Sequence, residues 1–176
     1  MKRKTESLLC ESFFELLKKN PFHKITIQMI SASSGVNRQT FYYHYDNIYD
    51  LLGKTIEYVF IQMGHLEEDI SWDEALSSFL TWMKDNRSVV KNLLNNVTAD
   101  YLRKAIYPII GKCMSSTYRP NVIISDIGTQ YEEEFLEHFL TIGITQYILE
   151  WAQEDFREPE EEVIDHIFFL LKRIYQ

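Results

Sequence analysis

Glycine and proline are scarce in this sequence, with six of the first and four of the second among 176 residues. Both residues interrupt regular structure, so their scarcity predicts long elements joined by few turns. Apolar residues recur at three- and four-residue steps through most of the chain, and the alternation typical of strands is almost lacking. We therefore expect an all-α protein.

Cysteine is rare as well. Cys10 and Cys113 are the two cysteines, and both lie in apolar segments without the spacing of metal ligands, so we expect free thiols in a reducing compartment. No apolar stretch approaches the roughly 18 residues needed to cross a membrane. No apolar run follows the first letters, MKRKTES, as it would in a signal peptide. These absences predict a cytoplasmic protein with no membrane partner.

Motifs for catalysis are also missing. The sequence contains no glycine-rich phosphate loop, no nucleophile elbow and no Cys/His pair at catalytic spacing. Its five histidines do not gather with other ligand types into the convergent set that a metal ion needs. We expect neither an enzyme, nor a bound cofactor, nor a metal site.

Positive charge is in the minority, yet it is unevenly placed. The whole chain carries a net charge of −8, whereas residues 1–50 contain seven Lys or Arg against five Asp or Glu and so carry +2. The remaining residues therefore carry −10. A mildly basic front joined to an acidic body fits a protein that touches a polyanion with one end, although chance asymmetry would give the same numbers. We expect a front domain at 1–50 and a body at 51–176.

A helix, a tight turn and a second short helix are predicted around the segment SASSGVNRQTFYYHYDN (31–47). Thr26 is a favourable N-cap for the first of these helices, and Gly35 would end it in a left-handed conformation. Asn37 would then cap a helix that reaches about Tyr43. This order is the outline of a helix-turn-helix, whose second helix enters the major groove of DNA.

The second of these helices carries the residue types that a groove contact needs. Arg pairs with guanine and Gln with adenine through two hydrogen bonds, and a thymine methyl group suits Thr or an aromatic ring. Tyrosine and histidine side chains reach phosphate oxygens. Phe41 would anchor the helix to the one before it, and packing is also the expected role of Tyr45. The side chains left to face DNA are Arg38, Gln39, Thr40, Tyr42, Tyr43 and His44.

The stretch ITIQMISASSGVNRQTFYYHYDNIYDLL resembles the DNA-binding segment of the TetR family of bacterial transcription regulators, and the resemblance covers about residues 5–55. The shared features, in order, are a threonine that opens the second helix, Gly-Val before the turn, Thr-Phe-Tyr in the recognition helix, His-Tyr at its end and a following Leu-Leu pair. The resemblance implies phosphate contacts for Thr26 and Tyr42, and a place near the DNA backbone for His44. The residues expected to contact DNA are Thr26, Asn37, Arg38, Gln39, Thr40, Tyr42, Tyr43, His44 and Lys54.

Three positions depart from the family pattern. Gln39 stands where the family commonly has Gly or Ala, which implies an additional base contact. Asp46 and Ile48 stand where the family favours a phosphate-binding lysine, so binding would be weaker and less dependent on salt. The residues that could replace this contact are Lys54, Lys24 and the N-terminal Lys2, Arg3 and Lys4.

For the body, the resemblance implies ligand sensing and dimerisation. The last two long helices, expected at about 130–155 and 159–175, are apolar on more than one face. We expect them to form a homodimer interface, with packing inside the chain as the alternative. Aromatic side chains are candidates for the wall of a ligand pocket, although core packing is the simpler role for each. They are Phe79, Trp82, Tyr101, Tyr107, Tyr118 and Trp151.

These expectations combine into a sequence-specific DNA-binding regulator, a ligand-released repressor that binds an inverted-repeat operator as a homodimer. The alternative is a regulator that acts through a partner protein and senses no small molecule. The letters RQTFY, followed by LL, are also similar to the TetR-like activators of dihydroxyacetone kinase genes, which work with a coactivator protein. A closed, fully packed body would favour the partner, whereas a cavity with convergent polar groups would favour the ligand.

Overall fold

Helices make up nearly all of the structure, a computed structural model that describes residues 2–62, 72–118 and 130–175. No strand occurs in these ranges, which confirms the all-α prediction. Within the same ranges, no helix is both long and apolar enough to cross a lipid bilayer. The elements in chain order are α1 (Lys2–Lys19), the 3-10 helix η1 (Phe22–Lys24), α2 (Ile27–Ser34), α3 (Arg38–His44), α4 (Ile48–Gln62), α5 (Trp72–Asp85), α6 (Arg87–Asn96), α7 (Ala99–Tyr118), α8 (Gln130–Gln153) and α9 (Glu160–Tyr175).

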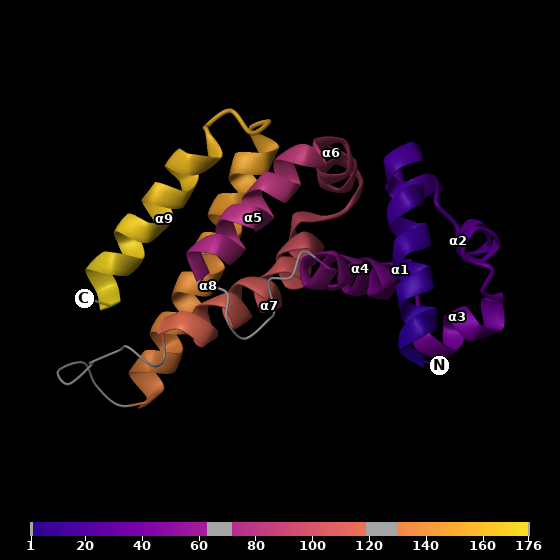
Figure 1. The fold of residues 1–176 in the computed structure, drawn as a ribbon, viewed down its shortest axis with the longest axis horizontal. Helices are drawn as coiled ribbons and strands as arrows, with labels where there is room; N and C mark the ends of the chain where they lie inside the picture. Colours follow the sequence, from indigo (N-terminus) through magenta and orange to yellow (C-terminus); the bar gives the residue numbers. More distant parts are fainter. Residues whose placement is uncertain (1, 63–71, 119–129, 176) are drawn as a thin grey trace.

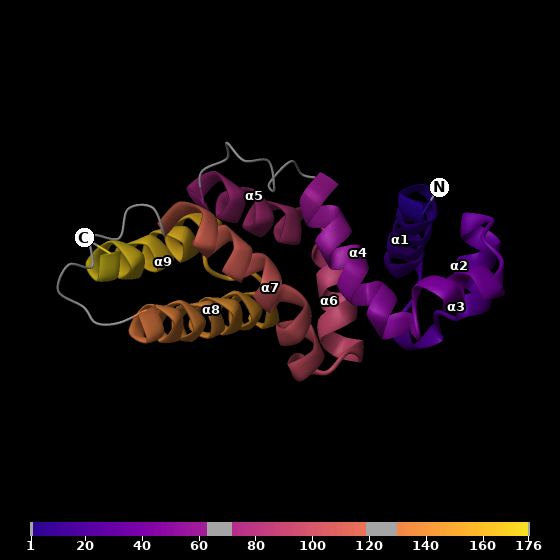
Figure 2. The same ribbon diagram turned by 90° about the horizontal axis from the view of Figure 1, so that it is seen from below.

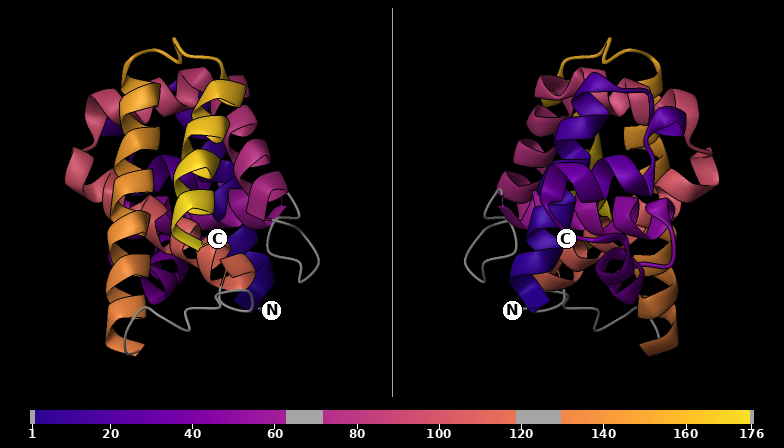
Figure 3. Two further views of the ribbon diagram at one scale, coloured as in Figure 1. Left: turned by 90° about the vertical axis from the view of Figure 1, so that its left-hand side faces the viewer. Right: turned by 90° about the vertical axis from the view of Figure 1, so that its right-hand side faces the viewer.

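The first and the last helices lie at opposite ends of the molecule (Figure 1). We call α1, η1, α2 and α3 the head, and α5 to α9 the body. α4 leads from the head into the body, where it packs against α7 (Figure 2). α8 and α9 lie side by side on the face of the body that points away from the head (Figure 3, left). The head and this outer face are therefore available to separate partners.

The helix ends in the head follow the side chains predicted to form them. Thr26 Oγ1 accepts a hydrogen bond from the Met29 amide at 3.2 Å, so Thr26 caps α2. Gly35 ends α2 with φ of 70°, a left-handed conformation that glycine adopts without a steric penalty. Asn37 Oδ1 accepts from the Thr40 amide at 2.7 Å and caps α3. These contacts confirm the helix, turn and helix expected around Gly35.

One hydrophobic core runs from the head into the body. Phe13 of α1 and Phe41 of α3 are fully buried in the head, as are Leu51 and Leu52 at the start of α4. Further along α4, Phe60 meets Phe79 of α5 at a ring-centroid distance of 5.6 Å. α4 thus contributes to both parts of the core and passes through the domain boundary expected at residue 50.

The turn between α8 and α9 is held by polar and aromatic contacts. Asp155 and Phe156 have positive φ angles of 68° and 57°, which cost energy for residues other than glycine. Asp155 forms ion pairs with Arg87 and Lys91 of α6, and hydrogen bonds from Lys91 and Arg87 lower the pKa of its carboxyl. The Phe156 ring packs edge-on against Trp151 at 4.8 Å. These contacts stabilise a turn that places α9 beside α8.

Two glycines test the local rules for backbone conformation. A Cβ atom would meet nothing within 4 Å at Gly35 or at Gly53 in α4. Replacement by alanine therefore causes no clash with neighbouring atoms at either position, and the two variants differ only in backbone conformation. Gly35→Ala should lower the free energy of unfolding by about 1–2 kcal/mol, because φ at this position is left-handed. Gly53→Ala should raise it by about 0.5–1 kcal/mol, because Gly53 lies inside a helix. Urea unfolding followed by circular dichroism measures both, and shifts of the same sign would contradict the prediction.

Candidate nucleic-acid interface

The exposed face of α3 carries long polar side chains. Tyr43 is 77% exposed and Tyr42 50% exposed, and Arg38 and Gln39 are exposed as well. Within the described residues, neither Arg38 nor Gln39 has a side-chain hydrogen bond or ion pair. Phe41, on the other side of the helix, is fully buried. The buried Phe41 ring therefore anchors α3, and the helix presents hydrogen-bond donors and acceptors without a partner in the described residues on its outer face.

Two capping residues retain hydrogen-bonding capacity for an outside group. The Thr26 hydroxyl oxygen accepts from the Met29 amide, which leaves its hydrogen free to donate. Asn37 uses only its carbonyl oxygen on the Thr40 amide, so its NH₂ group remains available. Both side chains are exposed, whereas Thr40 is half-buried. Thr26 and Asn37 can thus cap helices and bind an anion at once.

His44 lies differently from its expected place at the DNA backbone. Its side chain is only 5% exposed, and its Nδ1 lies 3.3 Å from Glu6 Oε1 of α1. Its imidazole is therefore turned toward α1 and away from the outer face of α3. The physical reason is position: His44 is the last residue of α3, where the helix packs back toward the rest of the head.

The start of α4 explains the departures at Asp46 and Ile48. Ile48 is partly buried against the core, so it packs where a lysine would reach out. Asp46 and Asp50 are both exposed, and the Asp46 amide donates to Asp50 Oδ2 at 3.1 Å. Exposed carboxylates repel phosphate groups, so a weakened contact at this position stays a prediction.

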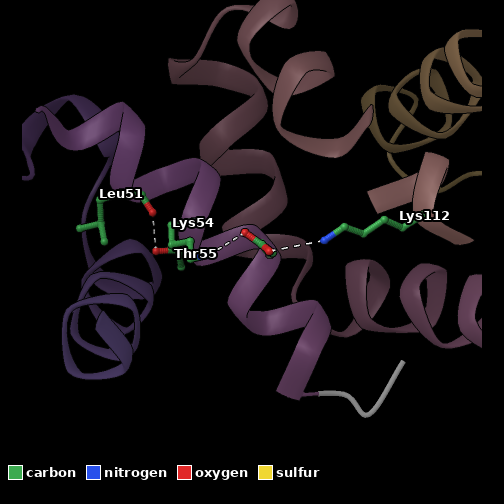
Figure 4. A network of polar contacts seen from close by, with 5 residues as sticks. Leu51, Lys54, Thr55 and Lys112 are labelled. Carbon is green, nitrogen blue, oxygen red and sulfur yellow. Dashed lines mark hydrogen bonds and ion pairs between the residues drawn. The ribbon is translucent and has the colours of Figure 1, made fainter. Parts of the chain in front are cut away.

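Lys54, expected to replace the missing phosphate contact, takes part in a polar network between α4 and α7 (Figure 4). Its Nζ donates to Glu57 Oε2 at 2.9 Å, and Lys112 Nζ of α7 lies 3.7 Å from Glu57 Oε1. The hydrogen bond from Lys54, together with the charge of Lys112, holds the pKa of Glu57 below its usual range. Nearby, the Thr55 hydroxyl donates to the Leu51 carbonyl at 2.7 Å. Lys54 is 42% exposed and so remains accessible from one side.

The aromatic residues expected to line one pocket are not brought together. Phe79 and Trp82 of α5 share an apolar hollow of about 50 Å³ with residues such as Leu102 and Leu149. Tyr101 packs instead on Tyr49 of α4 at 4.8 Å. The side chain of Tyr118 lies outside the described residues.

The other two aromatic residues also lie elsewhere. The Tyr107 hydroxyl is 2.6 Å from His138 Nδ1, between α7 and α8. Trp151 donates from Nε1 to the Glu158 carbonyl at 2.8 Å, in the turn before α9. The five residues whose side chains are described therefore meet partners from different helices.

A groove of about 340 Å³ between α4 and α7 was not expected from the sequence. Its floor includes Phe60 and Ile109, and Lys104 and Lys112 stand on its α7 side. Both lysines, with Pro108 between them, follow each other at four-residue steps, so they share one face of α7. This four-residue spacing was the one signal for the groove in the sequence, but it could not show which surface of α4 lies opposite.

Comparisons with known proteins agree with this architecture. Residues 14–54 match the family model described as "Bacterial regulatory proteins, tetR family", and residues 70–173 match "Transcriptional regulator C-terminal region". The HTH-type dhaKLM operon transcriptional activator DhaS of Lactococcus lactis subsp. lactis (strain IL1403) is 26% identical over 84 residues. That match covers 47% of this chain and 45% of the activator, so it spans about half the length of this relative.

Two solved structures are similar over almost the whole chain. One is a dihydroxyacetone kinase operon activator DhaS, with a TM-score of 0.66, 18% identity and coverage of 97% of this chain and 96% of that one. The other is a TetR transcriptional regulator from Streptococcus agalactiae 2603V, with a TM-score of 0.55, 22% identity and coverage of 99% and 95%. At these identities the likeness shows the fold. Since the C-terminal model alone spans more than half of the chain and the N-terminal model covers the helix-turn-helix, this protein belongs to the TetR family of bacterial transcriptional regulators.

Proposed function

We propose that this regulator reads an inverted-repeat operator as a homodimer, with one α3 in each half-site. The observation that carries the proposal is the outward face of α3, where Arg38, Gln39 and Tyr42 are exposed opposite the buried Phe41. The N-terminal residues of a recognition helix meet base edges in the major groove. Arg38 and Gln39 stand at that end and read bases, while Tyr42 and Thr26 bind phosphate oxygens.

The remaining contacts are assigned by position along the same surface. Tyr43 and Thr40 flank the base-reading pair, and Asn37 offers its NH₂ group at the start of α3. Lys54 reaches the DNA backbone from α4 if its bond to Glu57 opens. With Asp46 and Asp50 exposed nearby, few phosphates are neutralised, so the affinity should depend weakly on salt.

An exposed apolar stripe on α8 supports the homodimer. Tyr131, Phe135, Phe139 and Ile142 lie on one face of the helix and are between 45% and 78% exposed. The rings of Phe135 and Phe139 stack at 6.1 Å. On α9, Phe169 and Leu170 are exposed as well. Adjacent apolar surface of this kind is typical of an interface between subunits, and a second copy of the same face would cover it.

A partner protein is the better supported source of regulation. The hollow inside the body measures about 50 Å³ and its lining is apolar throughout, whereas ligand pockets span roughly 300–1,000 Å³ and include polar groups. A hollow of this size and lining does not suit a ligand, which favours input at the surface of the molecule. The resemblance to TetR-like activators of dihydroxyacetone kinase genes also implies a coactivator protein. We therefore propose an activator that works with a partner in preference to a ligand-released repressor.

The groove between α4 and α7 favours a second candidate, release by a small anion. Its volume of about 340 Å³ suits a small metabolite. Lys104 and Lys112 supply positive charge at the rim, and Lys112 already lies 3.7 Å from the Glu57 carboxylate. An anion that replaced Glu57 as the partner of Lys112 would separate α4 from α7, which would alter the support of the head.

Selection of duplexes from a random DNA pool tests the operator and the dimer together. The parent protein should enrich an inverted repeat with half-sites about one helical turn apart. Phe139→Asp should remain folded but monomeric, because it places a charge in the α8 stripe, and should enrich no repeat. Ile61→Asp, an exposed apolar residue of α4, is the matched control and should behave as the parent does. A Phe139→Asp variant that stays dimeric would count against the interface, and a monomeric one that still enriches the repeat would count against operator reading by a dimer.

Tyr42 and Gln39 should respond differently to truncation. Tyr42→Ala should weaken binding to all duplexes alike, because a phosphate contact carries no sequence information. Gln39→Ala should reduce discrimination at one base pair by roughly 1–3 kcal/mol. Fluorescence anisotropy with the selected operator and its single-pair variants measures both effects, and Gln153→Ala, at the exposed end of α8, is the control. If both variants bound every duplex as the parent does, α3 would not be the reading helix.

The two sources of regulation give opposite results with small probes. Under the partner proposal, operator affinity of the purified dimer should be unchanged by dihydroxyacetone or by dihydroxyacetone phosphate, because regulation then requires a protein and the apolar hollow of about 50 Å³ has no room for either compound. A loss of affinity with the phosphate that disappears in Lys104→Ala and Lys112→Ala, but persists in Lys84→Ala on α5, would instead establish the groove as a ligand site. The measurement is a competition titration at constant ionic strength.

A further inference from the structure

The C-terminal end of α1 is capped by a side chain from the body. Asn92 of α6 donates from Nδ2 to the Leu17 carbonyl at 2.8 Å and to the Asn20 carbonyl at 2.7 Å. Its Oδ1 accepts from the Phe22 amide, the first residue of η1, at 2.9 Å. The last carbonyls of a helix lack partners inside the helix, so they need such groups from elsewhere. A body residue therefore completes the backbone hydrogen bonding of the head.

The geometry leaves the Asn92 amide a single orientation. Two carbonyl oxygens require its NH₂ group, and one amide hydrogen requires its oxygen, so the two ends of the side chain cannot exchange. Asn96 Nδ2, one turn later, donates to Asn92 Oδ1 at 3.1 Å and to the Asn92 carbonyl at 2.8 Å. Asn96 also contacts His23 of η1. Asn92 thus holds α1 and η1 at a defined angle to α6.

On its other side, α6 is attached to the helices proposed to form the dimer. Lys91, next to Asn92, and Arg87 form ion pairs with Asp155 in the turn between α8 and α9. α6 also packs directly against α8. The remaining contacts between head and body include the rings of Phe14 and Trp82, 5.8 Å apart. Apolar contacts such as this one are not directional, so the hydrogen bonds of Asn92 define the angle.

We infer that Asn92 determines which half-site spacing the dimer accepts. This inference rests on the proposed operator binding by a homodimer, in which two α3 helices must meet major grooves about 34 Å apart. A head that turns about the end of α1 changes that separation. Asn92 lies in α6 and acts as a positioning residue, through its bonds to Leu17, Asn20 and Phe22. A head without these hydrogen bonds still binds its own half-site, but the dimer no longer discriminates between different half-site spacings.

The test compares Asn92→Ala with the parent on operators whose half-sites are moved apart or together by one or two base pairs. The parent should prefer one spacing by at least about tenfold. Asn92→Ala should lose about tenfold on that operator, because binding must then order heads that are no longer held at a fixed angle, and should discriminate among spacings by less than about twofold. Binding to a duplex with one half-site, and its base preference, should be unchanged. Asn95→Ala, an exposed asparagine of the same helix, should match the parent throughout.

Two results would overturn the inference. One is an Asn92→Ala dimer that retains the spacing preference of the parent. The other concerns Asn96→Ala, used if circular dichroism shows that Asn92→Ala is unfolded. This variant keeps the three backbone contacts of Asn92 but removes the hydrogen bond from Asn96 Nδ2 to Asn92 Oδ1 and the contact of Asn96 with His23, and it should broaden the preference to a smaller extent. If Asn96→Ala keeps the spacing preference of the parent, the inference is wrong as well. Failure of the parent to select any inverted repeat would contradict the dimer proposal itself, which separates the two cases.

Discussion

The packing of α4 against α1 at one end and against α7 at the other holds the molecule in one frame. Leu51 and Leu52 are fully buried at its start, and Phe60 is buried near its end. The Thr55 hydroxyl, buried between them, donates to the Leu51 carbonyl and so needs no outside partner. Since α4 belongs to both cores, the head cannot shift without a cost in the body. The position of the reading helix is thereby coupled to the body.

A second connection, through α6, is polar where that of α4 is largely apolar. Asn92 bonds to backbone groups of the head, while the adjacent Lys91 reaches the turn before α9. Directional bonds at this junction complement the apolar packing, because burial sets how tightly two surfaces adhere and hydrogen bonds set their angle. The proposed placement of two heads on one DNA duplex would need both properties.

On the surface proposed to face DNA, single polar residues have two roles. Thr26 and Asn37 satisfy the amides at helix starts and keep a donor for an outside group. Arg38 and Gln39 stay exposed because the buried ring of Phe41 supplies the anchor. The apolar hollow of about 50 Å³ in the body has no polar lining to hold a ligand, which supports the proposed regulation by a partner protein. Under that proposal, α4 and α6 are the elements that connect the body to the head.

Much of the head could be predicted from the sequence. The caps at Thr26 and Asn37, the left-handed Gly35 and the buried face of Phe41 depend on residues a few positions apart. The family resemblance identified the same segment. Helix ends and apolar faces in the body were also predictable, since α8 and α9 end within about two residues of their expected limits.

Only the tertiary structure decided which helix each face meets. His44 turns to Glu6, and the five described aromatic residues expected in one pocket divide among separate contacts. The α4–α7 groove and the cap that Asn92 provides for α1 appear only once the helices are packed. The physical reason is that helical periodicity shows which face is apolar or polar. The partner of that face lies dozens of residues away in the chain, and its approach is determined by how all the helices fill one core.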